Sequence, residues 1–350
     1  ATWARGGPIS WSSPFHLFAN VRFFGQVLTW TLPLLPLLLV KAKRLSPWVQ
    51  ALVFLFGAFW WSLQFATASR GTWVAIALAP LVGALLLRRP VIQWARIQVP
   101  LMGVGSLLYL LIFTRHAPGV ARTVEASSQM DGPRLAMWGQ AIEWALANPW
   151  LGLGPMQLAI QETFKGITHP HNAPLQLAAE WGLPAALLAA WLTVWALSAW
   201  LRDRALEEGS SRENLVTDAS LASALLAGGA HAWVSGILVM PASQFMGAVV
   251  VGYAWSRFRT SRAHAPSPPA RRPLLRQALL LPGLLVPALV LVVPALAQWP
   301  HLRHYEYLFS QTDRPLHPRF WLQGRLDFPP WAPLPSRPEA SEIAEPYSSP

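Results

Sequence analysis

Residues 169–200 read HPHNAPLQLAAEWGLPAALLAAWLTVWALSAW, so two histidines and an asparagine directly precede a long apolar segment. Asn172, Gln176 and Glu180 recur every four residues and would form one polar stripe on a helix. Polar groups in a membrane helix are costly, and they usually face a cavity or a partner. The stretch therefore predicts a membrane helix that carries a functional site at its start. The structural alternative is a helix capped by Asn172, with Gln176 and Glu180 joining neighbouring helices.

The composition is that of a membrane protein. The 350-residue chain is 53% hydrophobic and 12% charged, whereas a soluble domain is roughly 25% charged. The sequence therefore predicts an all-α, polytopic transmembrane helix bundle over residues 1–298, followed by a Pro-rich tail over 299–350. There is no cysteine, which excludes disulfides and thiolate chemistry. Eight apolar stretches are expected to span the membrane: 23–40, 47–68, 72–87, 98–113, 173–200, 218–238, 240–256 and 278–298.

The lysines and arginines predict how the bundle is oriented. With eight alternating spans, all four basic clusters fall on one side, which the positive-inside rule makes cytoplasmic. This placement explains the net charge of +11 by contact with membrane lipids, and it argues against nucleic acid as a partner. The clusters are Lys41, Lys43 and Arg44; Arg88, Arg89 and Arg96; Arg202, Arg204 and Arg212; and Arg257, Arg259, Arg262, Arg271, Arg272 and Arg276.

The opposite side holds residues 114–172, the only long connection inside the bundle. Connections of this length with structure of their own are usually functional. Asp131-Gly132-Pro133 is typical of a helix start and Asn148-Pro149 of a helix stop, so we expect a helix from Asp131 to about Ala147.

Three arginines on this side adjoin apolar spans, namely Arg22, Arg70 and Arg134. Arg70 occupies a very short turn between two spans, and a buried charge costs about 2.5–3.5 kcal/mol at mid-bilayer and less near the interface. The guanidinium fork suits phosphate, so converging arginines would form a diphosphate clamp. The alternatives are snorkelling of Arg70 to lipid headgroups and an ordinary surface position for Arg134.

The remaining motifs point to chemistry without a metal or cofactor. The sequence has no acidic metal pair, no phosphate-binding or dinucleotide loop and no nucleophile elbow, and His169 and His171 lack an obvious third ligand. A histidine pair, a carboxylate at Glu180 and nearby arginines suit transfer of a group from a diphosphate to a hydroxyl. Histidine would take the hydroxyl proton, and the arginines would stabilise the departing diphosphate.

Several of these motifs resemble a known family. His171-Asn172 followed after nine residues by Gly182 resembles the His-Asn/Ser/Gln…Gly-x-x-Gly signature of bacterial O-antigen ligases, with Ala185 in place of the last glycine. The wider series is similar to the superfamily that joins these ligases with O-antigen polymerases and pilin O-oligosaccharyltransferases. The resemblance covers about residues 15–255 and comprises Ser69-Arg70-Gly71, Arg134-x-x-x-Trp138, Asn148-Pro149-x-x-Gly152-x-Gly154 and His169-x-His171-Asn172-x-x-x-Gln176-x-x-x-Glu180-x-Gly182.

The resemblance implies a GT-C-like, multi-pass glycosyltransferase of the bacterial inner membrane whose active site faces the periplasm. It implies inverting, metal-independent transfer of a glycan from undecaprenyl diphosphate to a hydroxyl of lipid A core, a polysaccharide or a pilin. Members of the superfamily have more spans than are visible here, so we expect N-terminal spans to be missing.

By position, His171 matches the family's proposed base, and Arg70 and Arg134 match its diphosphate-binding arginines. The residues expected to support the base or bind substrate are His169, Glu180, Gln176, Asn172 and Arg22.

Two other classes of function stay open at this point. In a transporter or flippase for lipid-linked sugars, the arginines and histidines would only bind and release the substrate. In a non-catalytic assembly scaffold, none of these residues would matter individually. The place of His231 is open as well, because it either faces the site or packs between helices.

Overall fold

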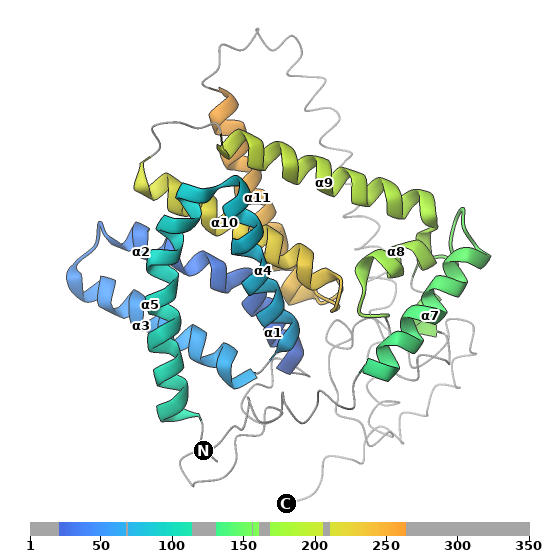
Figure 1. Cartoon of the computed structure of the whole chain (residues 1–350), viewed down its shortest axis with the longest axis horizontal. Helices are drawn as coiled ribbons and strands as arrows, with labels where there is room; N and C mark the ends of the chain where they lie inside the picture. Colours follow the sequence, from blue (N-terminus) through green and yellow to red (C-terminus); the bar gives the residue numbers. More distant parts are fainter. Residues whose placement is uncertain are drawn as a thin grey trace, which may run out of the picture. The chain divides into compact units, whose positions relative to one another are not determined.

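The computed structural model describes residues 21–67, 69–113, 131–155, 157–160, 169–205 and 211–263 (Figure 1). In this part of the chain the secondary structure is entirely helical. The described residues up to Arg259 belong to one compact unit. The helices are α1 (Val21–Thr31), η2 (Leu32–Leu34), α2 (Leu35–Ala42), α3 (Pro47–Thr67), α4 (Arg70–Leu86), α5 (Arg88–Ile112), α7 (Asp131–Ala147), η4 (Gln157–Ile160), α8 (Ala173–Trp181), α9 (Leu183–Ala205), α10 (Arg212–Ala232) and α11 (Pro241–Ala263).

Four of the described helical stretches are long and apolar enough to cross a membrane: Arg22–Ala42, Pro47–Thr67, Arg88–Ile112 and Leu183–Ala205. Helix α4 is apolar but shorter. The predicted all-α, polytopic membrane fold is confirmed. The span expected at 278–298 and the tail from 299 lie outside the described residues.

Helix α10 is the centre of the bundle and packs against α1, α2, α4 and α5. Most of its buried positions are alanine, serine and glycine, which let neighbouring helices approach closely. Gly228 shows this directly, because a Cβ there would lie 2.1 Å from the ring of Trp30. Small side chains rather than strong hydropathy therefore place α10 in the interior.

The expected single span over 173–200 is wrong, because the chain breaks at Gly182. This residue has φ 85° and ψ 165°, a conformation that essentially only glycine adopts. Helix α8 ends before it and α9 begins after it, with Pro184 in the first turn of α9. The polar stripe from Asn172 to Glu180 thus belongs to the short α8, which lies beside α7 (Figure 1), and α9 is the candidate membrane span.

Other expected spans correspond to single helices whose ends differ from the expected ones. The span placed at 98–113 is the second half of α5, which already begins at Arg88. The segments placed at 218–238 and 240–256 are helices α10, which runs from Arg212 to Ala232, and α11, which starts at Pro241. Neither is among the described helices that are long and apolar enough to cross a membrane.

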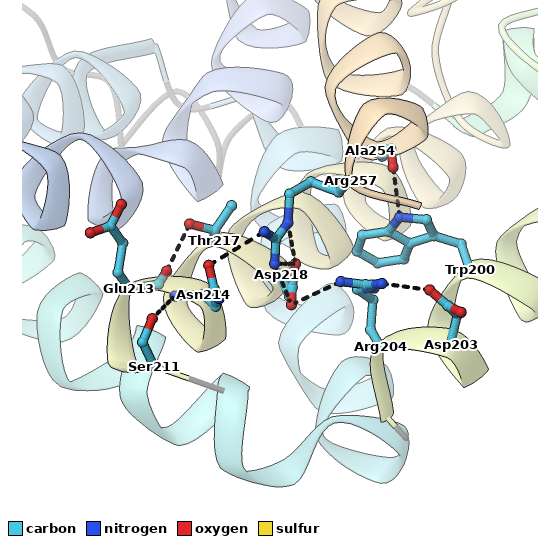
Figure 2. Close-up of polar contacts among 10 residues, drawn as sticks. All are labelled: Trp200, Asp203, Arg204, Ser211, Glu213, Asn214, Thr217, Asp218, Ala254 and Arg257. Carbon is cyan, nitrogen blue, oxygen red and sulfur yellow. Dashed lines mark hydrogen bonds and ion pairs between the residues drawn. The ribbon is translucent and has the colours of Figure 1, made fainter. Parts of the chain in front are cut away.

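Three of the four basic clusters meet at one end of the bundle. Figure 2 shows Asp218 of α10 between Arg257 of α11 and Arg204 of α9. Arg257 donates to the two Asp218 carboxylate oxygens at 3.0 and 3.2 Å, and Arg204 lies 3.8 Å from one of them. The cluster around Lys41 reaches the same helix through an ion pair with Glu213. The tertiary structure thus brings basic residues of three clusters to the same end of α10, as the charge pattern predicts.

Candidate functional site

His169 and His171 lie in the connection that leads into α8. Their rings pack edge to face, with centroids 4.3 Å apart and planes at 67°. His169 is fully buried, whereas His171 is half-buried. His171 has φ 53° and is the only non-glycine residue with positive φ among those the structure describes. This conformation costs an L-residue roughly 1–2 kcal/mol, and such strain is found preferentially at functional sites.

Asn172 forms the cap of α8. Its side-chain oxygen accepts a hydrogen bond of 3.0 Å from the Leu175 amide, and its carbonyl accepts one of 2.9 Å from the Gln176 amide. The structural alternative considered from the sequence is therefore correct for Asn172, and a role in substrate binding stays a prediction. One turn further on, the Gln176 side-chain amide donates to the Glu180 carboxylate at 3.4 Å.

The Gly-rich turn after α7 wraps around the end of α8. The amides of Leu153 and Gly154 donate to the carbonyls of Ala179 and Glu180 at 2.8 and 2.9 Å. A Cβ at Gly152 would lie 2.4 Å from the Glu180 backbone. The glycines of this motif therefore allow the backbone of the turn to contact the backbone at the end of α8, the helix that carries Glu180.

Two of the three predicted arginines, Arg134 and Arg22, act on His171, and the third, Arg70, lies near Arg22. Arg134, in the first turn of α7, acts electrostatically on His171 and on His231. Arg22 at the start of α1 also acts on His171, and it is repelled in turn by Arg70 of α4. Segments far apart in the sequence thus bring several positive charges to one place, which is the electrostatic arrangement of an anion site.

Both histidines of the pair are neutral at physiological pH. Burial, with the charges of Arg134 and Arg22 adding to it, lowers the pKa of His171 from 6.5 to about 4. Burial and then His171 lower the pKa of His169 from 6.5 to about 3. A neutral imidazole has a free lone pair, so His171 is in the protonation state that a general base requires.

The structure also settles where His231 lies. It is buried at the end of α10, and its Nδ1 is 2.7 Å from the Thr29 hydroxyl of α1. A Cβ on Gly71 would lie 2.5 Å from its Nε2, so the imidazole rests against the backbone next to Arg70. His231 therefore packs between α1 and α4, against the backbone next to Arg70.

Further polar contacts tie α1, α4 and the turn after α10 together at this end. The Thr72 hydroxyl donates to the Gly25 carbonyl at 2.8 Å, and the Ser69 hydroxyl lies 3.0 Å from the Thr72 oxygen, which can accept from it. Gln26 donates to Ser235 at 3.0 Å. Reasoning from the sequence missed these residues, because isolated threonines, serines and glutamines in apolar spans give no periodic signal; Gly25 and Gly71, at the close approaches, are the only local hint.

Within the described ranges, no three histidine, aspartate or glutamate side chains gather in a way that could hold a metal ion. The expected independence from metals and cofactors stays a prediction.

A family model matches part of the chain. Residues 51–190, from α3 into α9, match the family model described as O-antigen ligase. The matched segment contains Arg70, Arg134 and the stretch from His169 to Gly182 but neither Arg22 nor His231. Members of this family are ligases or glycosyltransferases, so the match supports an enzyme of the O-antigen ligase and polymerase superfamily. No curated protein and no solved structure gives a significant match.

Proposed function

We propose, on the premise that residues 51–190 are an O-antigen ligase domain, that this protein transfers a glycan from undecaprenyl diphosphate to an acceptor hydroxyl. The reaction would take place at the periplasmic face of the bacterial inner membrane, and lipid A core is the acceptor that we favour. The observation that carries this proposal is the neutral His171 beside Arg134 and Arg22, with Arg70 close to Arg22.

In the proposed reaction, a ring nitrogen of His171 takes the proton of the acceptor hydroxyl. The acceptor oxygen attacks the anomeric carbon of the glycan, and the bond from that carbon to the diphosphate oxygen breaks on the opposite face. The anomeric configuration is therefore inverted, and undecaprenyl diphosphate leaves with the bonding electron pair. Arg70, Arg134 and Arg22 stabilise the negative charge that grows on the leaving group.

The surrounding residues have supporting roles in this proposal. His169, packed against the ring of His171, limits how that ring can turn. Glu180 and Gln176 lie along α8, where they would orient the acceptor. No metal takes part, because the arginines supply the positive charge.

Donor binding should strengthen the base. In the empty site the charges of Arg134 and Arg22 lower the pKa of His171. A bound diphosphate would oppose these charges, so the pKa of His171 would rise and the imidazole would accept a proton more readily. The base would then be most effective only when the donor is in place.

The test uses the purified protein in proteoliposomes, a lipid-diphosphate-linked glycan and an acceptor, with release of the lipid carrier as the readout. His171→Ala should lower the transfer rate by roughly 10²–10⁴, the usual contribution of a general base. Arg70→Lys should impair transfer, since a point charge does not replace the bidentate fork. Arg96→Lys, at an exposed position on α5, is the matched control and should leave transfer unchanged.

The outcomes separate the alternatives. Normal transfer by His171→Ala overturns the assignment of the base. Movement of the donor across the membrane without carrier release would instead establish a transporter or flippase. Offering lipid A core, polysaccharide and pilin acceptors in parallel distinguishes a ligase from a polymerase or a pilin oligosaccharyltransferase.

A further inference from the structure

The strained backbone of His171 must be held from both sides. Its φ of 53° persists only where neighbouring contacts prevent relaxation to a negative value. On the C-terminal side, Asn172 is fixed as the cap of α8. On the N-terminal side lies Pro170, which has no backbone N–H and can be anchored through hydrogen bonding only by its carbonyl oxygen.

That carbonyl is anchored by α7. The indole nitrogen of Trp138 donates a hydrogen bond of 2.8 Å to the Pro170 oxygen. The carbonyl of Pro170 and the amide nitrogen of His171 belong to one rigid peptide plane. Rotation about φ of His171 turns this plane relative to the imidazole, so relaxation of φ would swing the carbonyl away from Trp138.

The same helix also carries Arg134, one turn before Trp138. Residues four apart lie on the same face of a helix, and Arg134 is the arginine with the larger electrostatic effect on His171. Helix α7 therefore supplies both a charge that acts on the imidazole and the hydrogen bond that orients the peptide before it.

We infer that Trp138 is a positioning residue for the proposed transfer reaction: its indole N–H holds the Pro170–His171 peptide, and so keeps the His171 imidazole aligned with Arg134 and the acceptor hydroxyl. The inference rests on the proposed role of His171 as the base. Trp138 acts through this peptide and has no direct chemical role in the proposed transfer.

Removing the N–H should act on the chemical step more than on donor binding. In Trp138→Phe an aromatic ring remains, but the Pro170 carbonyl loses its donor and His171 can relax. A shift of the base by about 1 Å lowers the rate by up to 10²-fold, so we expect kcat to fall by about 10- to 100-fold. The arginines are untouched, and KM for the donor should stay within about twofold of the original value.

The acid limb of the pH profile gives a second readout. If the imidazole moves away from Arg134, the lowering of its pKa weakens. The acid limb of kcat should then move to higher pH in Trp138→Phe. Trp150→Phe, at an exposed position just after α7, is the matched control and should change neither kcat nor the acid limb.

A double-mutant cycle with His171→Gln makes the experiment decisive. If Trp138 acts through His171, Trp138→Phe causes no additional loss once His171 has been replaced. An equal loss in both backgrounds, an unchanged kcat in Trp138→Phe, or failure of that variant to accumulate as a folded protein would overturn the inference. Unimpaired transfer by His171→Gln alone is a different result, because it refutes the base assignment and with it the proposed function.

Discussion

The backbone amide of Gly154 donates a hydrogen bond of 2.9 Å to the carbonyl oxygen of Glu180, and this contact joins two motifs that are far apart in the sequence. The last carbonyls of a helix have no partner within the helix. Here the amides of Leu153 and Gly154 donate to the last carbonyls of α8. In addition, the Leu183 amide donates a hydrogen bond of 2.8 Å to the Pro149 carbonyl. The glycine motif is thus a cap that fixes the end of α8 and, with it, the carboxylate of Glu180.

The first prediction concerns Gly182. A Cβ at this position would lie 2.3 Å from the Trp150 carbonyl oxygen, and φ is 85°. Neither the backbone of the turn nor this conformation tolerates an alanine, so Gly182→Ala should destabilise the protein by at least about 3 kcal/mol. The yield of monodisperse protein in detergent and its thermal unfolding midpoint measure the effect.

Gly139→Ala is the control for Gly182→Ala. Gly139 lies within α7, and a Cβ there would meet nothing within 4 Å. Alanine in a helix interior is favoured over glycine by roughly 0.5–1 kcal/mol. The midpoint should therefore rise slightly, and equal stability of the two variants would contradict the role assigned to Gly182.

The second prediction concerns Gly71 and His231. In Gly71→Ala the new methyl group would meet His231 Nε2 at 2.5 Å, so the imidazole must move and its contact with Thr29 is lost. Overpacking of this kind costs about 1–3 kcal/mol. Because Arg70 is the adjacent residue, KM for the donor should also rise severalfold.

Two further variants test this explanation. Gly103→Ala on α5, where a Cβ would meet nothing within 4 Å, should raise stability slightly, as for Gly139→Ala, and leave KM unchanged. Adding His231→Ala to Gly71→Ala makes room for the methyl group. If that second change brings no recovery of stability, the clash with His231 is not the cause.

The third prediction concerns pH. The pKa of His171 is lowered to about 4 and that of His169 to about 3, whereas an unfolded histidine has a pKa near 6.5. As the pH falls below 6.5, the unfolded state takes up protons that the folded state does not, so stability decreases towards pH 4. The slope is at most about 1.4 kcal/mol per pH unit for each histidine.

Thermal unfolding between pH 7.5 and 4.5 measures this slope. His171→Gln removes one of the two groups and should make the decline shallower, with little change above pH 6.5. An identical decline in both proteins would show that groups other than His171 determine the acid sensitivity.

The fourth prediction concerns the ionic cluster at the other end of α10. Asp218→Ala removes the buried carboxylate that Arg257 and Arg204 share, so Arg204 keeps only its ion pair with Asp203. Breaking a buried charge pair typically costs about 3–5 kcal/mol. The unfolding midpoint should fall strongly, while transfer per folded molecule should be retained, since Asp218 lies about 20 Å along the helix from His231.

Glu213→Ala on the same helix is the comparison. Its carboxylate pairs with the exposed side chains of Lys41 and Arg44, where solvent screens the attraction. Only a small change in the midpoint is expected. A larger loss for Glu213→Ala than for Asp218→Ala would be inconsistent with burial as the source of the stabilisation.

Local signals were sufficient for much of the fold. The predicted helix from Asp131 to Ala147 is observed with those bounds, because its start and stop depend on neighbouring residues only. Apolar length likewise predicted α3 and α9, which are long and apolar enough to cross a membrane. The expected continuous helix into α9 missed the break at Gly182. That break depends on the turn at Trp150, which a sequence window around Gly182 does not contain.

For the site, the sequence by itself determined which side chains have suitable chemistry. These are a histidine pair, a carboxylate and arginines that adjoin apolar spans. Only the tertiary structure decided how they are arranged. His231 is placed by Thr29, 202 residues away, and the peptide before His171 by Trp138. Helix caps and apolar periods are set within a few residues, whereas these contacts depend on how separate helices pack, and that packing also gives His171 its left-handed backbone and its lowered pKa.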